Sequence, residues 1–424
     1  MEIYIVQEGD TINSIADKYG ISVEKLLIDN SINDPNKLVI GQTIIIAYPK
    51  QTHVVQQGDT IQSVAGDYNV SVMQLLRNNP NMMDRNIIQP GETLVISYNT
   101  GKSITTNGYA FPYINQNILI KTLPGLTYLS IFNYRISESI EITQYYDDTE
   151  IINLSKIYGT IPLLLFSVLT LTGEADVETA YRILLNNDYQ EKVVNDLTKI
   201  AKDRGYLGIN WTINILNHDN QSLIVQLMQK ISERLKRENL LFIITVNFDD
   251  DLMNDNIDYS GFNLYADDII LIKLIWGVNY NPPAPVSDIN DIKHMINNTI
   301  NYISNNKIVL GKPTIGYDWQ LPYISDRSVA VSLNYNSVLE LAYDVNAAIQ
   351  FDESSQTPYF TYNQTDIGFP SQHIVWFIDA RSINALLKLV DQYNLGGSGI
   401  WNIMIYNSQL WLPIYSQYDI IKYI

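Results

Sequence analysis

Short hydrophobic runs alternate with amphipathic stretches along residues 103–424. Between several runs the hydrophobic positions recur every three to four residues, as Leu223, Leu227 and Ile231 do within 221–239. The runs themselves have the length of buried strands. They lie at 104–110, 127–133, 161–168, 207–213, 241–248, 268–275, 308–316 and 398–404. Eight strands with interleaved helices in about 320 residues predict a (β/α)8 TIM barrel of the α/β class.

One stretch of the barrel region is too long for an ordinary loop. Residues from about 325 to 376 lie between the seventh and eighth predicted strands and are rich in Tyr, Asn and Gln. A connection of this length inside a compact domain usually has secondary structure of its own. We therefore expect a small α+β insertion there.

The first hundred residues contain a duplication. The segment VQEGDTI at 6–12 recurs as VQQGDTI at 55–61. In each copy an alternating strand, a Gly-Asp-Thr turn, two short helices and a closing strand follow one another, and Ser22 and Ser71 are placed to cap the second helices. This pattern predicts two βααβ modules, at 1–48 and 52–98, followed by a polar linker and a barrel at 103–424.

The two units resemble LysM domains, which bind N-acetylglucosamine-containing glycans in a shallow groove. The resemblance places that groove between the first strand–helix loop and the second helix–strand loop. The residues carried over by position are Gly9, Asp10, Thr11, Ile12, Asn30, Gly58, Asp59, Thr60, Ile61 and Asn79. Each Gly, Asp or Thr could also serve only as a turn or cap residue. Two weak sites on one polymer gain effective concentration, which favours glycan binding by the pair.

Three segments of the barrel region resemble glycoside hydrolase family 18. They are YDWQLP at 317–322, VWFIDARS at 375–382 and GGSGIW at 396–401. The closest group is the LysM-bearing spore cortex N-acetylglucosaminidases, also called spore germination or cortex-fragment lytic enzymes. The resemblance covers nearly the whole chain in the same domain order, and it implies peptidoglycan or a chitin-like N-acetylglucosamine glycan as the partner, with other spore coat proteins or a second copy of the chain as further partners.

That family carries an Asp-x-x-Asp-x-Asp-x-Glu pattern on its fourth barrel strand. The Glu is the general acid, and the Asp two residues earlier orients the substrate's own acetamide, which is the nucleophile. Here the run LGINWTIN at 207–214 places Asn214 at the acid position, Thr212 at the acetamide-orienting position and Asn210 at the preceding Asp. Because an amide has no proton to donate at neutral pH, the general-acid contribution of about 10²–10⁴-fold should be missing.

A second position of the family pattern is also replaced. The Tyr-Asp pair on the sixth strand of the family corresponds here to Leu274 and Ile275. Loss at two strands favours a barrel that has lost its catalysis. Four residues still match sugar-facing positions: Trp401 under the bound sugar, Asp318 and Trp319 in the strand-seven loop, and Trp276 at the cleft rim. Core packing for Trp401 and a turn role for Asp318 are the alternatives.

Composition and charge narrow the class of partner. The formal net charge of −18 disfavours nucleic acid and anionic membranes but not neutral glycans. The chain has no cysteine, its four histidines have no ligand spacing, and no glycine-rich phosphate loop follows a strand, so we expect no metal and no cofactor. The start Met1-Glu2-Ile3-Tyr4 lacks the pattern of a secretory signal peptide. We therefore expect synthesis in the mother cell and deposition in the spore envelope (cortex, coat or exosporium).

Three functions remain open. The first is a peptidoglycan-binding protein of the spore envelope whose barrel no longer hydrolyses glycans. The second is an active cortical N-acetylglucosaminidase that uses another acid, such as Asp249 or Asp250 at the end of the fifth strand. The third is a self-assembling coat or exosporium protein. The 30 tyrosines and the low fraction of charged residues would suit ordered protein–protein packing in such a layer.

Overall fold

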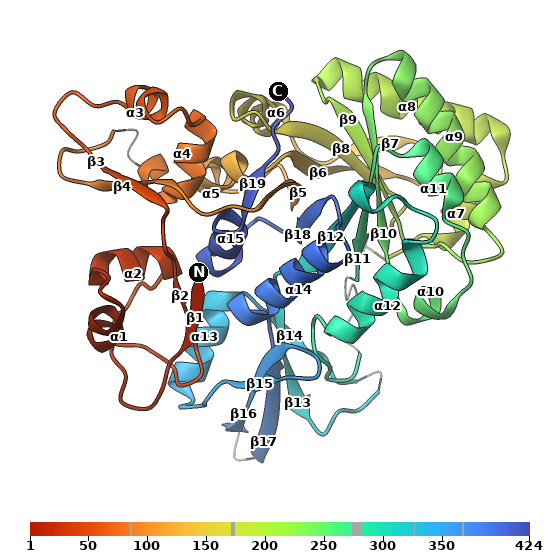
Figure 1. Ribbon diagram of the computed structural model, residues 1–424. Helices are drawn as coiled ribbons and strands as arrows, with labels where there is room; N and C mark the ends of the chain where they lie inside the picture. The colour runs from red at the N-terminus through yellow and green to blue at the C-terminus, as the bar shows by residue number, and fades with distance from the viewer. Residues whose placement is uncertain (85–86, 171–173, 274–280, 326, 367–368) are drawn as a thin grey trace.

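A computed structural model describes residues 1–84, 87–170, 174–273, 281–325, 327–366 and 369–424 (Figure 1). Two small modules come first, and a barrel with an inserted sheet follows. Among the described residues, no helix combines the length and the apolar character that a membrane crossing requires.

Each N-terminal module is a two-stranded antiparallel sheet with two helices on it, as the duplication predicts. The first contains β1 (Glu2–Ile5), α1 (Ile12–Tyr19), α2 (Val23–Asn30) and β2 (Thr43–Ile46). The second contains β3 (Gln51–Val54), α3 (Ile61–Asp67), α4 (Val72–Asn78), η1 (Pro80–Asp84) and β4 (Thr93–Ser97). Thr11 and Thr60 each begin the first helix of their module with a capping box, and Ser22 and Ser71 cap the second helices. The same local sequence thus produces the same caps in both copies.

The barrel prediction is confirmed. In the described part of the chain, eight parallel strands pair in sequence order and close when the last pairs with the first. They are β5 (Lys102–Ala110), β6 (Tyr128–Ile136), β8 (Ile161–Ser167), β9 (Gly208–Ile213), β10 (Leu241–Asn247), β11 (Asp268–Ile272), β12 (Ile308–Pro313) and β18 (Gly397–Trp401). Two short strands, β7 (Ile142–Gln144) and β19 (Tyr418–Ile420), extend the sheet.

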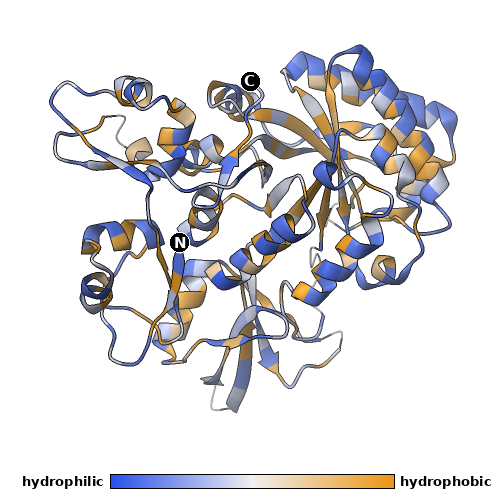
Figure 2. Ribbon diagram, in the orientation of Figure 1, coloured by the Kyte–Doolittle hydropathy of each residue, from blue (hydrophilic) through white to orange (hydrophobic). Residues whose placement is uncertain are grey.

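Amphipathic helices surround the barrel. They are α5 (Gln116–Thr122), α6 (Thr149–Ile157), α7 (Val177–Leu184), α8 (Asn187–Arg204), α9 (Gln221–Arg237), α10 (Asp250–Asn254), α11 (Ser260–Tyr265), α12 (Ile289–Thr299), α14 (Ala380–Gln392) and α15 (Ser408–Tyr415). The predicted stripe of α9 is buried at Ile224, Leu227 and Ile231. Figure 2 shows the result, with apolar strands in the centre and outer helices that are apolar only on their inner side.

The insertion forms a second, antiparallel sheet in the order β14-β13-β17-β16-β15. Its elements are β13 (Gly316–Leu321), β14 (Val331–Leu333), α13 (Tyr335–Asp344), β15 (Gln350–Asp352), β16 (Thr357–Asp366) and β17 (Phe369–Trp376). The prediction placed its start at about 325 and extended the seventh barrel strand to 316. The barrel strand instead ends at Pro313, and β13 already belongs to the insertion because Tyr317 pairs with Trp376 of β17.

The two modules rest against the barrel on the side of α15, and the first one also reaches the insertion (Figure 1). The sheet faces that do not carry the module helices share one apolar cluster with the barrel helices. That cluster contains Ile45, Ala47, Val95, Tyr98, Ala380 and Leu412. Both modules are therefore packed onto the barrel and are not held by the linker alone.

Candidate functional site

A chain of neutral polar side chains crosses the barrel interior. The Tyr109 hydroxyl lies 2.6 Å from that of Thr245, which donates to Asn210 Oδ1 at 2.9 Å. The Asn210 amide donates to Ser130 Oγ at 2.8 Å, and Ser130 donates to Asn107 Oδ1 at 2.8 Å. All five residues are buried. Asn210, which the family resemblance places at an Asp position, is thus part of a neutral hydrogen-bond network. A buried carboxylate at the same place would need a charged partner.

The predicted acid position lies at the carboxyl end of β9. Asn214 donates its amide to Ser167 Oγ at 2.9 Å, and Ser167 donates to the Thr212 carbonyl at 3.0 Å. Thr212 Oγ1 and Asn214 Oδ1 are buried, and neither has a hydrogen-bond partner among the described residues. The arrangement offers a sugar a hydroxyl and an amide oxygen, but these two groups carry no acidic proton.

The two replacement acids considered from the sequence are engaged elsewhere. The Asp249 carboxylate accepts the Leu252 backbone N–H at 2.7 Å and caps α10. Asp250 is largely exposed and forms an ion pair with Lys273 at 2.9 Å. Neither interaction directs a carboxyl group toward Asn214. The predicted strand-six positions Leu274 and Ile275, and Trp276 at the rim, lie outside the described residues.

Trp401 lies in the apolar interior of the barrel and retains 8% exposure. Its ring is 4.6 Å from that of Tyr109, at an angle of 52°. Trp401 is the last residue of β18 and so lies at the end of the barrel where active sites of TIM barrels are found. In this structure Trp401 is therefore chiefly a packing residue at the barrel mouth.

Two predicted sugar contacts are corrected by the geometry. Trp319 is only 1% exposed, and its indole N–H donates to the Asn281 carbonyl at 3.0 Å, so no ring face is open to a sugar. Asp318 accepts the Tyr362 hydroxyl at 2.6 Å and lies 3.0 Å from His373 Nδ1. It braces β13, β16 and β17 of the insertion and is not a simple turn residue.

An aromatic cluster at the barrel mouth was missed from the sequence. Phe111 follows β5 directly and stacks on Tyr113 at 5.3 Å, while Tyr113 meets Tyr146 edge-on at 5.1 Å. Phe132 of β6 packs on Phe111 at 5.2 Å. Tyr113 and Tyr146 are 58% and 51% exposed, which is enough surface for sugar C–H groups to stack. The signal in the sequence was aromatic residues at the carboxyl ends of the first two predicted strands.

The Gly-Asp-Thr loops of the modules have a structural role in both copies. Gly9 and Gly58 adopt left-handed backbone angles, with φ of 84° and 96°. Asp10 accepts the Gln7 N–H, and Asp59 accepts the Gln56 N–H, as turn carboxylates do. Thr11 and Thr60 are the exposed cap residues described above. Of the two isoleucines that follow, Ile12 is buried in the core of its module and Ile61 is half-buried, so Ile12 does not face a glycan.

Asn30 and Asn79 are also corrected, because they brace the module interior. The Asn30 amide donates to the Leu26 and Ile45 carbonyls, both at 3.0 Å, and its oxygen accepts the Ile45 N–H at 2.6 Å. Asn79 makes the equivalent bonds to Leu75 and Val95. Each side chain joins its second helix to the closing strand and has no free donor for a glycan.

Comparisons with known proteins agree with this architecture. The profile of glycosyl hydrolases family 18 matches residues 96–404, and that of the LysM domain matches residues 4–47 and 53–97. The chain is 31% identical to the cortical fragment-lytic enzyme of Bacillus subtilis, over 100% of this chain and 99% of that protein.

Solved structures of the same kind are similar over the full length. The spore cortex-lytic enzyme SleL of Bacillus megaterium matches with a TM-score of 0.80 and 27% identity, over 100% of this chain and 99% of that one. SleL of Bacillus cereus matches with a TM-score of 0.80 and 25% identity, over 99% of both chains. The two LysM domains indicate binding to N-acetylglucosamine-containing glycans such as peptidoglycan. The chain belongs to glycosyl hydrolases family 18, with two LysM domains in front of the family barrel.

Proposed function

We propose that this protein binds peptidoglycan of the spore envelope and that its barrel holds the glycan without cleaving it. The observation that carries the proposal is the pair at the end of β9, where Thr212 and Asn214 occupy the positions that the family uses for carboxyl groups. Glycosidic cleavage in this family needs a proton for the leaving oxygen and a charge to orient the acetamide. A hydroxyl and an amide supply neither.

The cleft retains features that suit binding. Trp401 lies at the barrel mouth with 8% exposure, and the Phe111, Tyr113 and Tyr146 cluster adds an exposed aromatic surface there. The Asn214 acceptor and the Thr212 hydroxyl are buried and have no partner among the described residues, so they are the groups that would hydrogen-bond a sugar that reaches the end of β9. Stacking with a few directed hydrogen bonds is how a binding groove holds a neutral sugar, and it involves no chemistry.

Sedimentation with purified peptidoglycan tests the binding half of the proposal. We expect the native chain to sediment with the glycan, and a Tyr113→Ala, Tyr146→Ala double variant to bind about tenfold more weakly, the effect of losing two stacking surfaces. Tyr302, which lies between α12 and β12, is 37% exposed and contacts Tyr259, provides a matched control as Tyr302→Ala. Equal binding by all three chains would contradict a role for the barrel mouth.

Restoring the carboxyl groups tests the catalytic half. An Asn214→Glu, Thr212→Asp version should gain the ability to release N-acetylglucosamine-ended products from cortex fragments, provided that the fragment binds in the cleft. Asn214→Gln, Thr212→Ser is the matched control, since it changes side-chain size without adding an acid. Release of the same products by the native chain at the rate of the restored one would contradict the proposal.

The similarity to lytic enzymes over the full length supports a second candidate, an active N-acetylglucosaminidase. It requires a carboxyl group to reach the cleft centre when glycan binds. An Asp249→Asn, Asp250→Asn variant separates the two candidates, because it would abolish turnover in the enzyme and leave glycan binding unchanged in the binding protein.

A further inference from the structure

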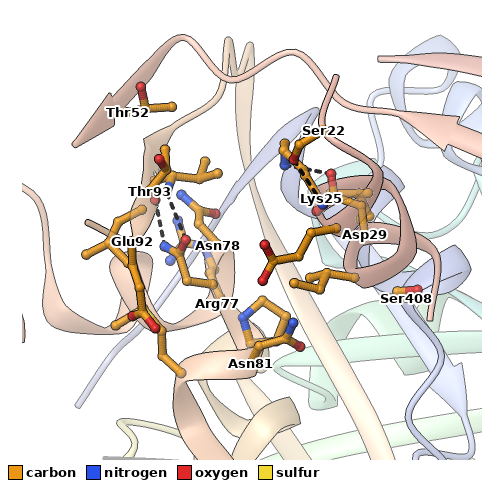
Figure 3. Close-up of a pocket in the computed structure, with 18 of the residues that line it drawn as sticks. Ser22, Lys25, Asp29, Thr52, Arg77, Asn78, Asn81, Glu92, Thr93 and Ser408 are labelled. Carbon is orange, nitrogen blue, oxygen red and sulfur yellow. Dashed lines mark hydrogen bonds and ion pairs between the residues drawn. The ribbon is translucent and has the colours of Figure 1, made fainter. Parts of the chain in front are cut away.

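A cavity of about 690 Å³ lies between the two LysM modules and α15. Figure 3 shows it with Lys25 and Asp29 of the first module on one side, and Arg77, Glu92 and Thr93 of the second module on the other. Ser408, the first residue of α15, closes it from the barrel. Its volume is in the range of small-molecule and peptide sites. It shares Asn79 and the second helix–strand loop with the groove implied by the LysM resemblance, but it lies on the side that faces the first module and the barrel and does not include the Gly-Asp-Thr loops.

In the first module, the corresponding surface is filled by a side chain of the barrel. Gln409 donates its amide to Asn30 Oδ1 at 2.9 Å and to the Thr43 carbonyl at 3.0 Å. The Thr43 hydroxyl donates to Gln409 Oε1 at 2.8 Å. All three residues are buried. This surface of a LysM module can therefore bind a carboxamide through both its donor and its acceptor.

In the second module, the equivalent surface is open to the cavity. Asn79 and Thr93 are the equivalents of Asn30 and Thr43, and both line the cavity. Thr93 is exposed, whereas Thr43 is fully buried. Asn79 Oδ1 accepts the Val95 N–H at 2.8 Å, as Asn30 Oδ1 accepts the Ile45 N–H. Asn30 Oδ1 also accepts the Gln409 amide, whereas no described residue makes that second bond to Asn79 Oδ1. The groups equivalent to those that bind the Gln409 amide in the first module therefore line the cavity in the second.

Three cavity-lining residues also have a buried polar atom without a partner in the described part of the chain. They are Arg77 at Nε, Ser408 at Oγ and Tyr415 at its hydroxyl. Arg77 is 4% exposed, and its ion-pair contact to Asp419 is long at 3.4 Å. The Tyr415 hydroxyl lies against Gly125, which is not among the residues that line the cavity, so Arg77 and Ser408 are the unpartnered groups that a polar ligand in the cavity could satisfy. A guanidinium with a hydroxyl is a donor set that suits a carboxylate.

We infer that this cavity binds a short peptide with a free carboxylate, of the kind that peptidoglycan carries on its glycan. A peptide amide would contact Asn79 and Thr93 as the Gln409 amide contacts Asn30 and Thr43, and the carboxylate would face Arg77. Glu24, Asp29 and Glu92 also line the cavity, so a singly charged carboxylate fits better than a doubly charged phosphate. The identity of the ligand as a wall peptide rests on the proposed function.

Calorimetry on the full chain tests the inference, with the stem tripeptide L-Ala-γ-D-Glu-diaminopimelate as the probe. We expect binding that weakens about tenfold in Ser408→Ala and in Thr93→Val, because each loses one hydrogen bond to a charged or amide group. The tripeptide with its carboxylates amidated should bind less tightly. A tetramer of N-acetylglucosamine should bind all these chains equally.

Two controls separate weaker binding at the cavity from unfolding and from loss of the aromatic surface at the barrel mouth. Removing the unpartnered hydroxyl of Ser408 leaves the melting temperature unchanged or raises it, so weaker binding does not come from unfolding. The Tyr113→Ala, Tyr146→Ala chain should retain tripeptide binding. Tetramer binding without tripeptide binding would overturn the inference and leave the proposed function standing. Failure of both ligands would overturn both, and tripeptide binding unchanged in Ser408→Ala and Thr93→Val would exclude this cavity.

Discussion

The two LysM modules share their strands, caps and bracing asparagines but differ in what covers them. In the first, Gly41 and Thr43 are buried against the barrel and its insertion. In the second, the equivalents Gly91 and Thr93 are exposed. Local sequence fixes the fold of each module, while the barrel decides which module is a structural contact and which keeps an open surface. The duplication therefore does not imply duplicated function.

The largest expected effect comes from a matched pair of glycine substitutions. Gly41 and Gly91 have φ of 84° and 94°, so alanine is strained at either position by about 1–2 kcal/mol. At Gly41 a Cβ would also lie 1.9 Å from the Ile349 carbonyl oxygen, whereas at Gly91 it meets no atom within 4 Å. We expect Gly41→Ala to lower the free energy of unfolding by about 3 kcal/mol more than Gly91→Ala.

Urea unfolding of the two alanine variants measures this difference. Gly20→Ala serves as a further control within the first module, since Gly20 has a φ of 64° and an added Cβ would meet no atom within 4 Å. Equal losses at Gly41 and Gly91 would mean that the first module is not held against the insertion in solution.

A second pair compares neighbouring residues of α15. Gln409 faces the first module, and its removal leaves the buried Thr43 hydroxyl with only the Tyr335 hydroxyl, 3.4 Å away, and Asn30 with one bond fewer. Ser408 faces the cavity beside the second module and loses no bond when shortened. We expect Gln409→Ala to cost about 2–3 kcal/mol and Ser408→Ala to cost about nothing, measured by thermal unfolding. A costly Ser408→Ala would show that its hydroxyl has a partner in the protein.

The smallest effect concerns pH. The first strand of the second module carries His53 where the first module has Tyr4, and both contact the turn aspartate. The Gln56 N–H, followed by His53, lowers the pKa of Asp59 below its usual range. A lowered carboxyl pKa gives stability that is complete above about pH 4 and is lost as the pH falls through the folded value.

Amide exchange of the second module between pH 2 and 6 checks this sign. Exchange should accelerate as the pH falls below about 4 in the native chain, after correction for the intrinsic rate. In Asp59→Asn the protection should be lower and independent of pH over that window. Pronounced protection loss above pH 5 would contradict the assignment to Asp59.

The sequence predicted the barrel and the modules because their signals are local. Buried runs of strand length and repeated caps at Thr11 and Thr60 depend only on neighbouring residues. The insertion boundary was wrong because β12 and β13 are separated by only two residues, so the hydrophobic pattern continues through the break.

The site residues were harder to predict because their roles depend on distant partners. Asn30 and Asn79 look like exposed loop amides in the sequence, and only the closing strand shows that their donors are used. Trp319 matches a family position, yet the insertion buries it. Gln409 carried no signal at all, since its partners Asn30 and Thr43 lie more than 360 residues away.

The central proposal is that the barrel binds peptidoglycan without cleaving it, and mass spectrometry of products tests it most directly. Purified protein would be incubated with lysozyme-digested spore cortex fragments, beside a cortical fragment-lytic enzyme as the positive control. We expect the fragments to be depleted from solution by binding and recovered with unchanged masses. New products ending in N-acetylglucosamine from the native chain would contradict the proposal and require an acid other than the residues at 212 and 214.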